Sequence, residues 1–263
     1  MKINRSHIKD TFAEYVSHYN TQDEKVKLKI DHTYRVAELC EKIAESERLS
    51  EDDISMAWLC GMLHDIGRFE QLRNYGTFID AESIDHALYG ASILFDEGRI
   101  QDYLEQPSEE ICAFLRRVIS CHSAYRVPKE YDERTRMFAD ILRDADKIDI
   151  LKVNIEVPLE DIYNVTTEEL MNAEVTKEVM DSFSEEHATL RALKKTPVDH
   201  VVGHISLVYE LVYPISLRIV NEQGYLDKLM NFPSWNPKTV KQFTELKAMM
   251  QGYICRKMSL LLE

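Results

Sequence analysis

The chain has 263 residues, of which 44% are hydrophobic and 30% charged, and its formal net charge is −14. These values fit a globular protein with a sizeable core, and the charge argues against broad binding to nucleic acids or anionic membranes, because their phosphates repel it. Glycine and proline are scarce, at 8 and 7 residues, whereas an all-β fold needs many turns. We therefore expect an all-α fold.

Hydrophobic residues recur at helical spacing through the first half of the chain. Ser83 is expected to be the N-cap of the helix that carries His86, while Gly67 and Gly98 are expected to end helices. The expected helices cover about residues 5–20, 51–66 and 83–98, and one that begins near Asp23 and runs past Ile43, with a loop at 68–82.

The second half shows the same spacing. Ser108, which two glutamates follow, is typical of a helix N-terminus. Pro197 suits the first turn of a helix, and Pro214 is expected to kink one. Helices are expected at about residues 108–122, 132–153, 166–188, 198–222 and 236–262.

Features that would take the chain out of the cytoplasm are not visible in the sequence. Residues 1–10 contain no apolar run, so we expect no signal peptide. The most apolar stretch, residues 201–220, contains His204, Glu210 and Arg218 and is a poor membrane span. The five cysteines form no CxxC pair, which argues against a disulfide framework or a zinc ribbon and favours buried free thiols. We expect a cytoplasmic protein.

The dipeptide His64-Asp65 follows the apolar run 56–63, which predicts that both side chains lie at the buried end of a helix. Unpaired polar groups are costly there, and a divalent cation is a partner that satisfies both. Four more residues have the same character, because each follows the apolar face of a different expected helix. These are His32, His86, His122 and Asp146.

In helix bundles, successive helices that are joined by return segments each contribute a ligand to one shared centre. One such histidine alone is more often a core residue than a ligand, but six groups on inward faces favour a metal centre. His7, His18 and His187 lie in polar surroundings and are expected at the surface. His200 and His204 form an HxxxH pair that could bind a metal, although it lacks the glutamate of HExxH.

The order His32, His64-Asp65, Asp146 resembles the HD superfamily of metal-dependent phosphohydrolases over roughly residues 28–150. The sequences HDIGRFEQ (64–71) and DADKID (144–149) fit the surroundings of the second and third motifs of that family. His86 and His122 resemble the two extra histidines of its binuclear branch, seen in cyclic nucleotide and cyclic dinucleotide phosphodiesterases. No GYP sequence follows the second motif, which departs from the cyclic dinucleotide enzymes.

The resemblance implies an HD-domain helical bundle formed by a single domain, residues 1–263. Its metal-binding core would lie at about 20–153, and a C-terminal helical extension at about 158–263. His32, His64, Asp65 and Asp146 would hold a first metal, and Asp65 would bridge to a second one at His86 and His122. One or two divalent transition metals are expected, and mixed nitrogen and oxygen ligands suit Fe, Mn, Co, Ni or Zn.

The chemistry that the resemblance implies is hydrolysis of a phosphate ester by metal-activated water. Asp65, Arg68 and Lys147 would take part in catalysis, and Arg68 and Lys147 would also bind the substrate phosphate. Glu70 is a weaker candidate, for proton transfer. The expected partner is a small phosphorylated substrate such as a nucleotide, with no broad nucleic-acid binding and no membrane association, while homo-oligomer formation is left open.

Three other interpretations remain. Some proteins of the same fold, such as inositol oxygenase and phosphonate-cleaving oxygenases, use a matching set of six ligands to hold two irons and activate dioxygen. A sensor would keep the ligands, bind a nucleotide or metal, and turn over nothing. A purely structural bundle is the least favoured, because burying six such groups without a metal has no evident benefit.

Overall fold

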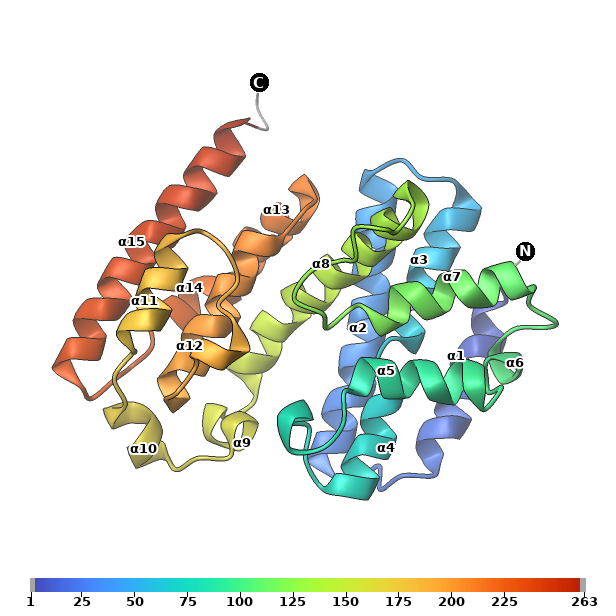
Figure 1. The fold of residues 1–263 in the computed structure, drawn as a ribbon, viewed down its shortest axis with the longest axis horizontal. Helices are drawn as coiled ribbons and strands as arrows, with labels where there is room; N and C mark the ends of the chain where they lie inside the picture. Colours follow the sequence, from blue (N-terminus) through green and yellow to red (C-terminus); the bar gives the residue numbers. More distant parts are fainter. Residues whose placement is uncertain (1–2, 261–263) are drawn as a thin grey trace. The chain divides into compact units, whose positions relative to one another are not determined.

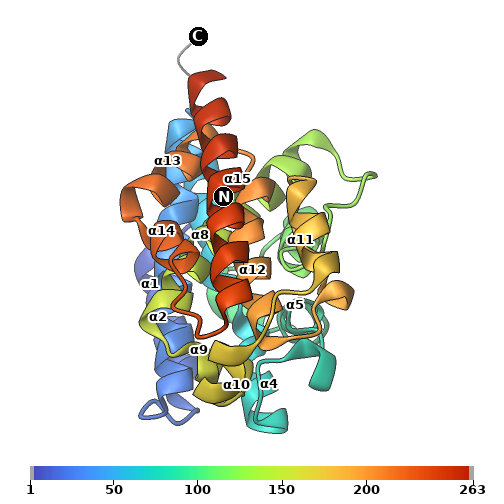
Figure 2. The ribbon, with the colours of Figure 1, turned by 90° about the vertical axis from the view of Figure 1, so that its left-hand side faces the viewer.

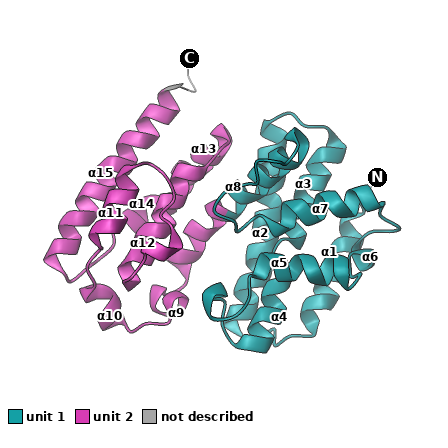
Figure 3. Cartoon of the chain, in the orientation of Figure 1, with its two compact units in different colours: residues 1–146 teal, residues 147–263 magenta. Residues whose placement is uncertain are grey.

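The computed structural model describes residues 3–260, and every regular element in that range is a helix (Figure 1). The expected all-α fold is thereby confirmed. The chain divides into two compact units, shown in separate colours in Figure 3. Unit 1 ends at Asp146 and unit 2 begins at Lys147, inside the helix α8 (Glu133–Glu156). The expected start of the C-terminal extension, near residue 158, lies just after this helix.

Unit 1 contains the candidate metal ligands. Before α8, its helices are α1 (Arg5–Ser17), α2 (Glu24–Ser46), α3 (Glu51–Leu63), α4 (Ile66–Tyr75), α5 (His86–Ala91), α6 (Ile100–Tyr103) and α7 (Glu109–Ser120), together with the 3₁₀ turn η1 (Asp80–Glu82) and the π-helical segment η2 (Ser92–Asp96).

The pair α2 and α3 forms the centre of unit 1, where the two helices lie side by side (Figure 1). The predicted apolar face of α2, with Val36, Leu39 and Ile43, is buried. Gly61 of α3 touches the backbone of α2, since a Cβ on Gly61 would lie 2.5 Å from the Cα of Ala37. Only glycine fits such an approach.

A second close approach joins α4 to α5. A Cβ on Gly67 would lie 2.3 Å from the carbonyl oxygen of His86 and 2.6 Å from the nitrogen of Gly90. Gly67 was expected to end a helix, and this prediction was wrong. The helix before it ends at Leu63, and Gly67 lies in the first turn of α4.

The predicted loop at 68–82 was also wrong over its first part, because α4 continues to Tyr75. The helix ends where Gly76 takes a φ of +70°, a left-handed conformation that glycine adopts at no steric cost. Ser83 is not the N-cap of the next helix. Asp85 takes that place, and its side chain accepts hydrogen bonds from the backbone of Ala87 and Leu88. The expected cap at Ser108 is confirmed.

Unit 2 begins with the end of α8, and Figure 2 views it with α15 in front. Pro197 occupies the first turn of its helix, as predicted. Pro214 does not kink a helix but starts one, because a 3₁₀ turn and an extended residue precede it. The helices of unit 2 are α9 (Leu159–Tyr163), α10 (Thr167–Asn172), α11 (Lys177–Ser184), α12 (Pro197–Ser206), α13 (Pro214–Gln223), α14 (Tyr225–Met230) and α15 (Pro237–Leu260), with 3₁₀ turns η3 (Arg191–Leu193) and η4 (Leu207–Glu210).

The expected helices at 166–188 and 198–222 are therefore each divided in the structure. The cysteines are free thiols, as predicted, but Cys255 is exposed and Cys112 is only half-buried. Among the described residues, no helix is both long and apolar enough to cross a membrane.

The contact between α4 and α5 yields a stability prediction. Gly67→Ala should lower the free energy of unfolding by about 1–3 kcal/mol, because the added methyl group meets backbone atoms that have no room to move. Urea unfolding followed by circular dichroism measures this. Gly252→Ala on α15 is the control, since its Cβ would approach only the flexible end of Arg256, at 3.4 Å. Equal stability of the Gly67 variant and the wild type would contradict the packing described here.

Candidate metal centre

The six predicted ligands come from six helices or their ends. His32 lies on α2, and Asp146 lies on α8. His64 follows the last residue of α3, and Asp65 directly precedes α4. His86 is the first residue of α5, and His122 lies two residues after the end of α7. The four imidazoles and Asp65 are at most 4% exposed.

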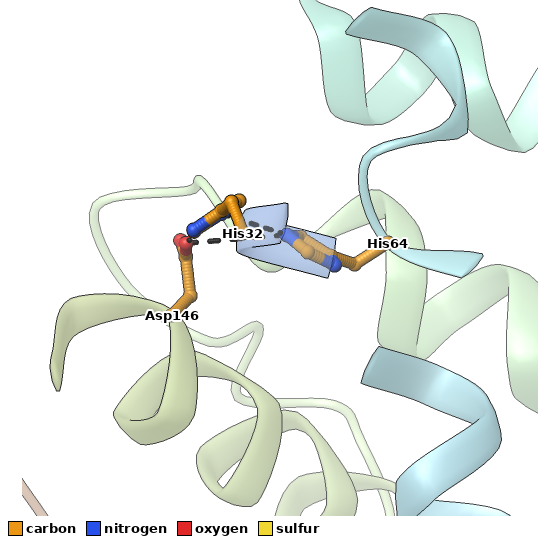
Figure 4. A group of neighbouring side chains, drawn as sticks. All are labelled: His32, His64 and Asp146. Atoms are coloured by element: carbon orange, nitrogen blue, oxygen red, sulfur yellow. Dashed lines mark hydrogen bonds and ion pairs between the residues drawn. The ribbon is translucent and has the colours of Figure 1, made fainter. Parts of the chain in front are cut away.

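His32, His64 and Asp146 form one group (Figure 4). Nε2 of His32 lies 3.3 Å from Nε2 of His64 and 3.2 Å from Oδ1 of Asp146. The Asp146 oxygen is also 4.0 Å from Nε2 of His64. Three potential ligand atoms therefore lie at most 4.0 Å from one another, as the ligands of one metal ion do.

His86 and His122 form a second group. Their Nε2 atoms are 3.0 Å apart, and their rings meet edge to face at 4.9 Å. Asp65 lies between the two groups. Its Oδ2 is 3.6 Å from Nε2 of both His32 and His64. Its Oδ1 is 3.5 Å from Nε2 of His86 and 3.7 Å from that of His122. Each carboxylate oxygen thus faces one pair of imidazoles.

The hydrogen bonds of the rings fix where their protons lie. Nδ1 of His64 contacts the carbonyl oxygen of Gly61 at 2.7 Å, and Nδ1 of His122 contacts that of Ile119 at 2.8 Å. Since a carbonyl only accepts, both Nδ1 atoms carry the proton and both Nε2 atoms present a lone pair. Nδ1 of His86 likewise donates to the carboxylate of Asp80.

Two lone pairs that face each other at 3.0 Å, as in His86 and His122, repel unless a cation lies between them. A proton is disfavoured as that cation, because burial lowers the pKa of His86 to about 4 and that of the neighbouring His64 to about 3. Two nitrogens bound to a metal at about 2.1 Å are roughly 3.0–3.4 Å apart in octahedral or tetrahedral geometry. The residues present therefore fit a divalent transition metal.

The central carboxylate remains charged although it is buried. Burial alone would raise the pKa of Asp65, but the positive charges of Lys29 and Arg68 hold it well below its ordinary value. Within residues 3–260, Oδ1 of Asp65 and Nε of Arg68 are buried and have no hydrogen-bond partner, and they lie 3.7 Å apart. Such atoms are rare in native proteins and indicate that a further group belongs at this position.

Sequence reasoning missed residues that support this centre. Nζ of Lys29 lies 2.8 Å from Oδ2 of Asp65. Asp80 accepts hydrogen bonds from Nδ1 of His86, from Arg68 and from Gln71. Lys29 precedes His32 by one helical turn, a spacing that could have revealed it. Asp80 follows α4 in a connecting segment, where no periodic pattern could have signalled it.

A second support holds the turn after α7. The guanidinium of Arg143 is almost completely buried and donates hydrogen bonds to the carbonyl oxygens of Cys121, His122 and Ala124. These oxygens follow the end of a helix and have no partner within it. Arg143 therefore fixes the backbone that carries the His122 ring.

The predicted substrate contacts are placed as follows. Arg68 donates through Nη1 to Gln71, to the carbonyl oxygen of Phe78 and to Asp80, which leaves Nε beside Asp65. Lys147 directly follows Asp146 in α8 and is 8% exposed. Glu70 accepts a hydrogen bond from Tyr19 at 2.6 Å and pairs with Arg73.

The remaining histidines lie elsewhere. His7 and His18 are exposed, as predicted, whereas His187 is only partly exposed and pairs with Glu185. His200 and His204 pack against the ring of Tyr163, and Nδ1 of His204 lies 2.8 Å from its hydroxyl and from Oδ1 of Asn154. Groups of metal-binding type within residues 3–260 do not include this pair.

Buried histidines and aspartates that converge from several helices fit a metal-binding helical protein. Comparison with known families agrees, because residues 30–151, a little under half of the chain, match the HD domain. This segment is an HD domain. A search among curated proteins and a search among solved structures found no match.

Metal analysis of the purified protein tests the centre. We expect one to two transition-metal ions per chain, and we expect His64→Ala and Asp65→Ala to remove most of them, because both residues lie where the groups converge. His200→Ala should retain the full metal content. Retention of metal by the Asp65 variant, or its loss from the His200 variant, would place the metal elsewhere.

The neutral histidines also predict the acid stability of the metal-free protein. His64 and His86 have folded pKa values near 3 and 4, below the ordinary 6.5, so the unfolded chain binds more protons between these limits. Stability should therefore fall as the pH drops from about 6.5 toward 4, by up to about 1.4 kcal/mol per pH unit for each histidine. Urea unfolding across this range measures the slope. His64→Gln should reduce the slope.

Proposed function

We propose that the protein hydrolyses a small phosphate ester at a binuclear metal centre. The single observation that carries the proposal is the position of Asp65 in an HD domain, with one oxygen toward His32 and His64 and the other toward His86 and His122. A carboxylate placed between two imidazole pairs suits a bridging ligand. Asp146 completes the first group.

The metals would lower the pKa of a bound water toward neutrality and neutralise phosphoryl oxygens. The protein itself supplies position. Asp80 and the carbonyl oxygens of Gly61 and Ile119 hold the imidazole rings with their Nε2 lone pairs inward. Such partners fix the tautomer and the orientation of a ligand ring. The ligands are therefore organised before a substrate arrives.

Arg68 is the proposed phosphate contact. Its Nη1 atom is held by Phe78 and Asp80, so the side chain loses little freedom when Nε donates to an anion beside Asp65. Lys147 stays a predicted contact on the basis of its place after Asp146. The proposed substrate class is a nucleotide or another small phosphate ester, and the net charge of −14 disfavours polymeric nucleic acid.

A second candidate function is dioxygen activation at a di-iron centre, which the same six ligands would allow. The guanidinium of Arg68 favours hydrolysis instead, because its Nε atom has no hydrogen-bond partner within residues 3–260 and is suited to an oxyanion. Oxygen consumption separates the two reactions, because hydrolysis proceeds without dioxygen.

An anaerobic assay tests the proposal. The protein loaded with Mn, Fe or Co should release phosphate or a monoester from at least one member of a panel of nucleotides, cyclic dinucleotides and phosphomonoesters. Arg68→Met should lower kcat/KM by about 10- to 100-fold, because one charge-assisted hydrogen bond to the phosphate is lost. Arg73→Met, on the same helix and 54% exposed, is the control. Absence of turnover with metal bound would favour the oxygenase or a sensor.

A further inference from the structure

Lys29 and Arg68 are distributed over the two oxygens of Asp65 in the same way as the two pairs of imidazoles. Nζ of Lys29 lies 2.8 Å from Oδ2, the oxygen that faces His32 and His64. Nε of Arg68 lies 3.7 Å from Oδ1, the oxygen that faces His86 and His122. Each half of the centre therefore has two imidazoles and one cationic side chain.

Phe78 links the two cations. Its ring lies 5.4 Å from Nζ of Lys29 and 5.8 Å from the guanidinium carbon of Arg68. A cation near an aromatic face is attracted by the ring quadrupole, so the phenyl group attracts both cations. The Lys29 and Arg68 side chains are 16% and 15% exposed, so both remain accessible to a small solute.

Lys29 differs from Arg68 in how it is held. Nη1 of Arg68 donates hydrogen bonds to three acceptors. Nζ of Lys29 is held by its ion pair with Asp65 and by its contact with the ring of Phe78. A divalent ion that binds Oδ2 of Asp65 competes directly with this ammonium group, since both need the same oxygen. A lysine side chain has a flexible four-carbon stem and can turn to another anion nearby.

We propose that Lys29 is a substrate-binding residue of this centre. It pairs with Asp65 in the metal-free protein and with a phosphoryl oxygen of the substrate in the metal-loaded protein. It thereby makes the site selective for a terminal, dianionic phosphate. This inference rests on the proposed function. The added positive charge stabilises the second negative charge of a phosphomonoester, which a phosphodiester does not carry. The favoured substrate class is therefore a phosphomonoester.

The test compares two probes that share a phosphorus centre and differ in charge. Inorganic phosphate is mainly a dianion at pH 8, and dimethyl phosphate is a monoanion. Calorimetric titration of the Mn-loaded full chain should show tighter binding of inorganic phosphate. Lys29→Met should weaken that binding by about 10- to 100-fold and change the affinity for dimethyl phosphate much less, while Lys29→Arg should keep most of the preference.

Lys27→Met is the matched control, because Lys27 lies on the same helix, 45% exposed, and pairs with Glu24. Metal content and circular dichroism are measured for every variant. Unchanged phosphate affinity in Lys29→Met, an equal loss for both probes, or loss of metal from that variant would overturn the inference. A wild-type protein that binds no metal would instead overturn the proposed function, so the two failures are distinguishable.

Discussion

The structure of unit 1 depends on one buried carboxylate. Asp65 is 1% exposed and remains charged, and a buried charge is tolerated only when cations or hydrogen-bond donors surround it. Lys29 and Arg68 meet this need directly, and a divalent ion held between the carboxylate and the four imidazoles would complete it; the six side chains come from five different helices or their ends. Because each contributes a short polar contact at one point, the helices have little freedom to shift without breaking the site.

Two glycines make this convergence sterically feasible. Gly61 lets α3 approach α2 closely enough for His64 to reach His32, and Gly67 lets α4 approach the start of α5, where His86 lies. A methyl group at either position would force the backbones apart by more than the contacts between the rings can absorb. The ligand geometry is thus a consequence of backbone packing as much as of the ligands themselves.

The supports of the site explain how it is organised without a substrate. Asp80 joins His86 to Arg68, so a ligand ring and the proposed phosphate contact share one carboxylate. Arg143 fixes the turn that carries His122. Lys29 neutralises Asp65 at Oδ2, and Arg68 lies beside Oδ1. These side chains restrict the rotamers of the ligands and keep the Nε2 lone pairs aimed at the centre.

The sequence by itself determined that the chain is helical and that six polar residues lie on inward faces, because apolar periodicity fixes which face of a helix is buried. It could not determine that α4 continues through the first part of the expected loop, or that Gly67 lies within α4. A glycine that ends a helix and one that permits a close contact look alike in sequence. Only the tertiary structure decided that Lys29 and Asp80 belong to the centre. Their roles depend on which oxygen or nitrogen they meet across the fold, and no local pattern records such a contact.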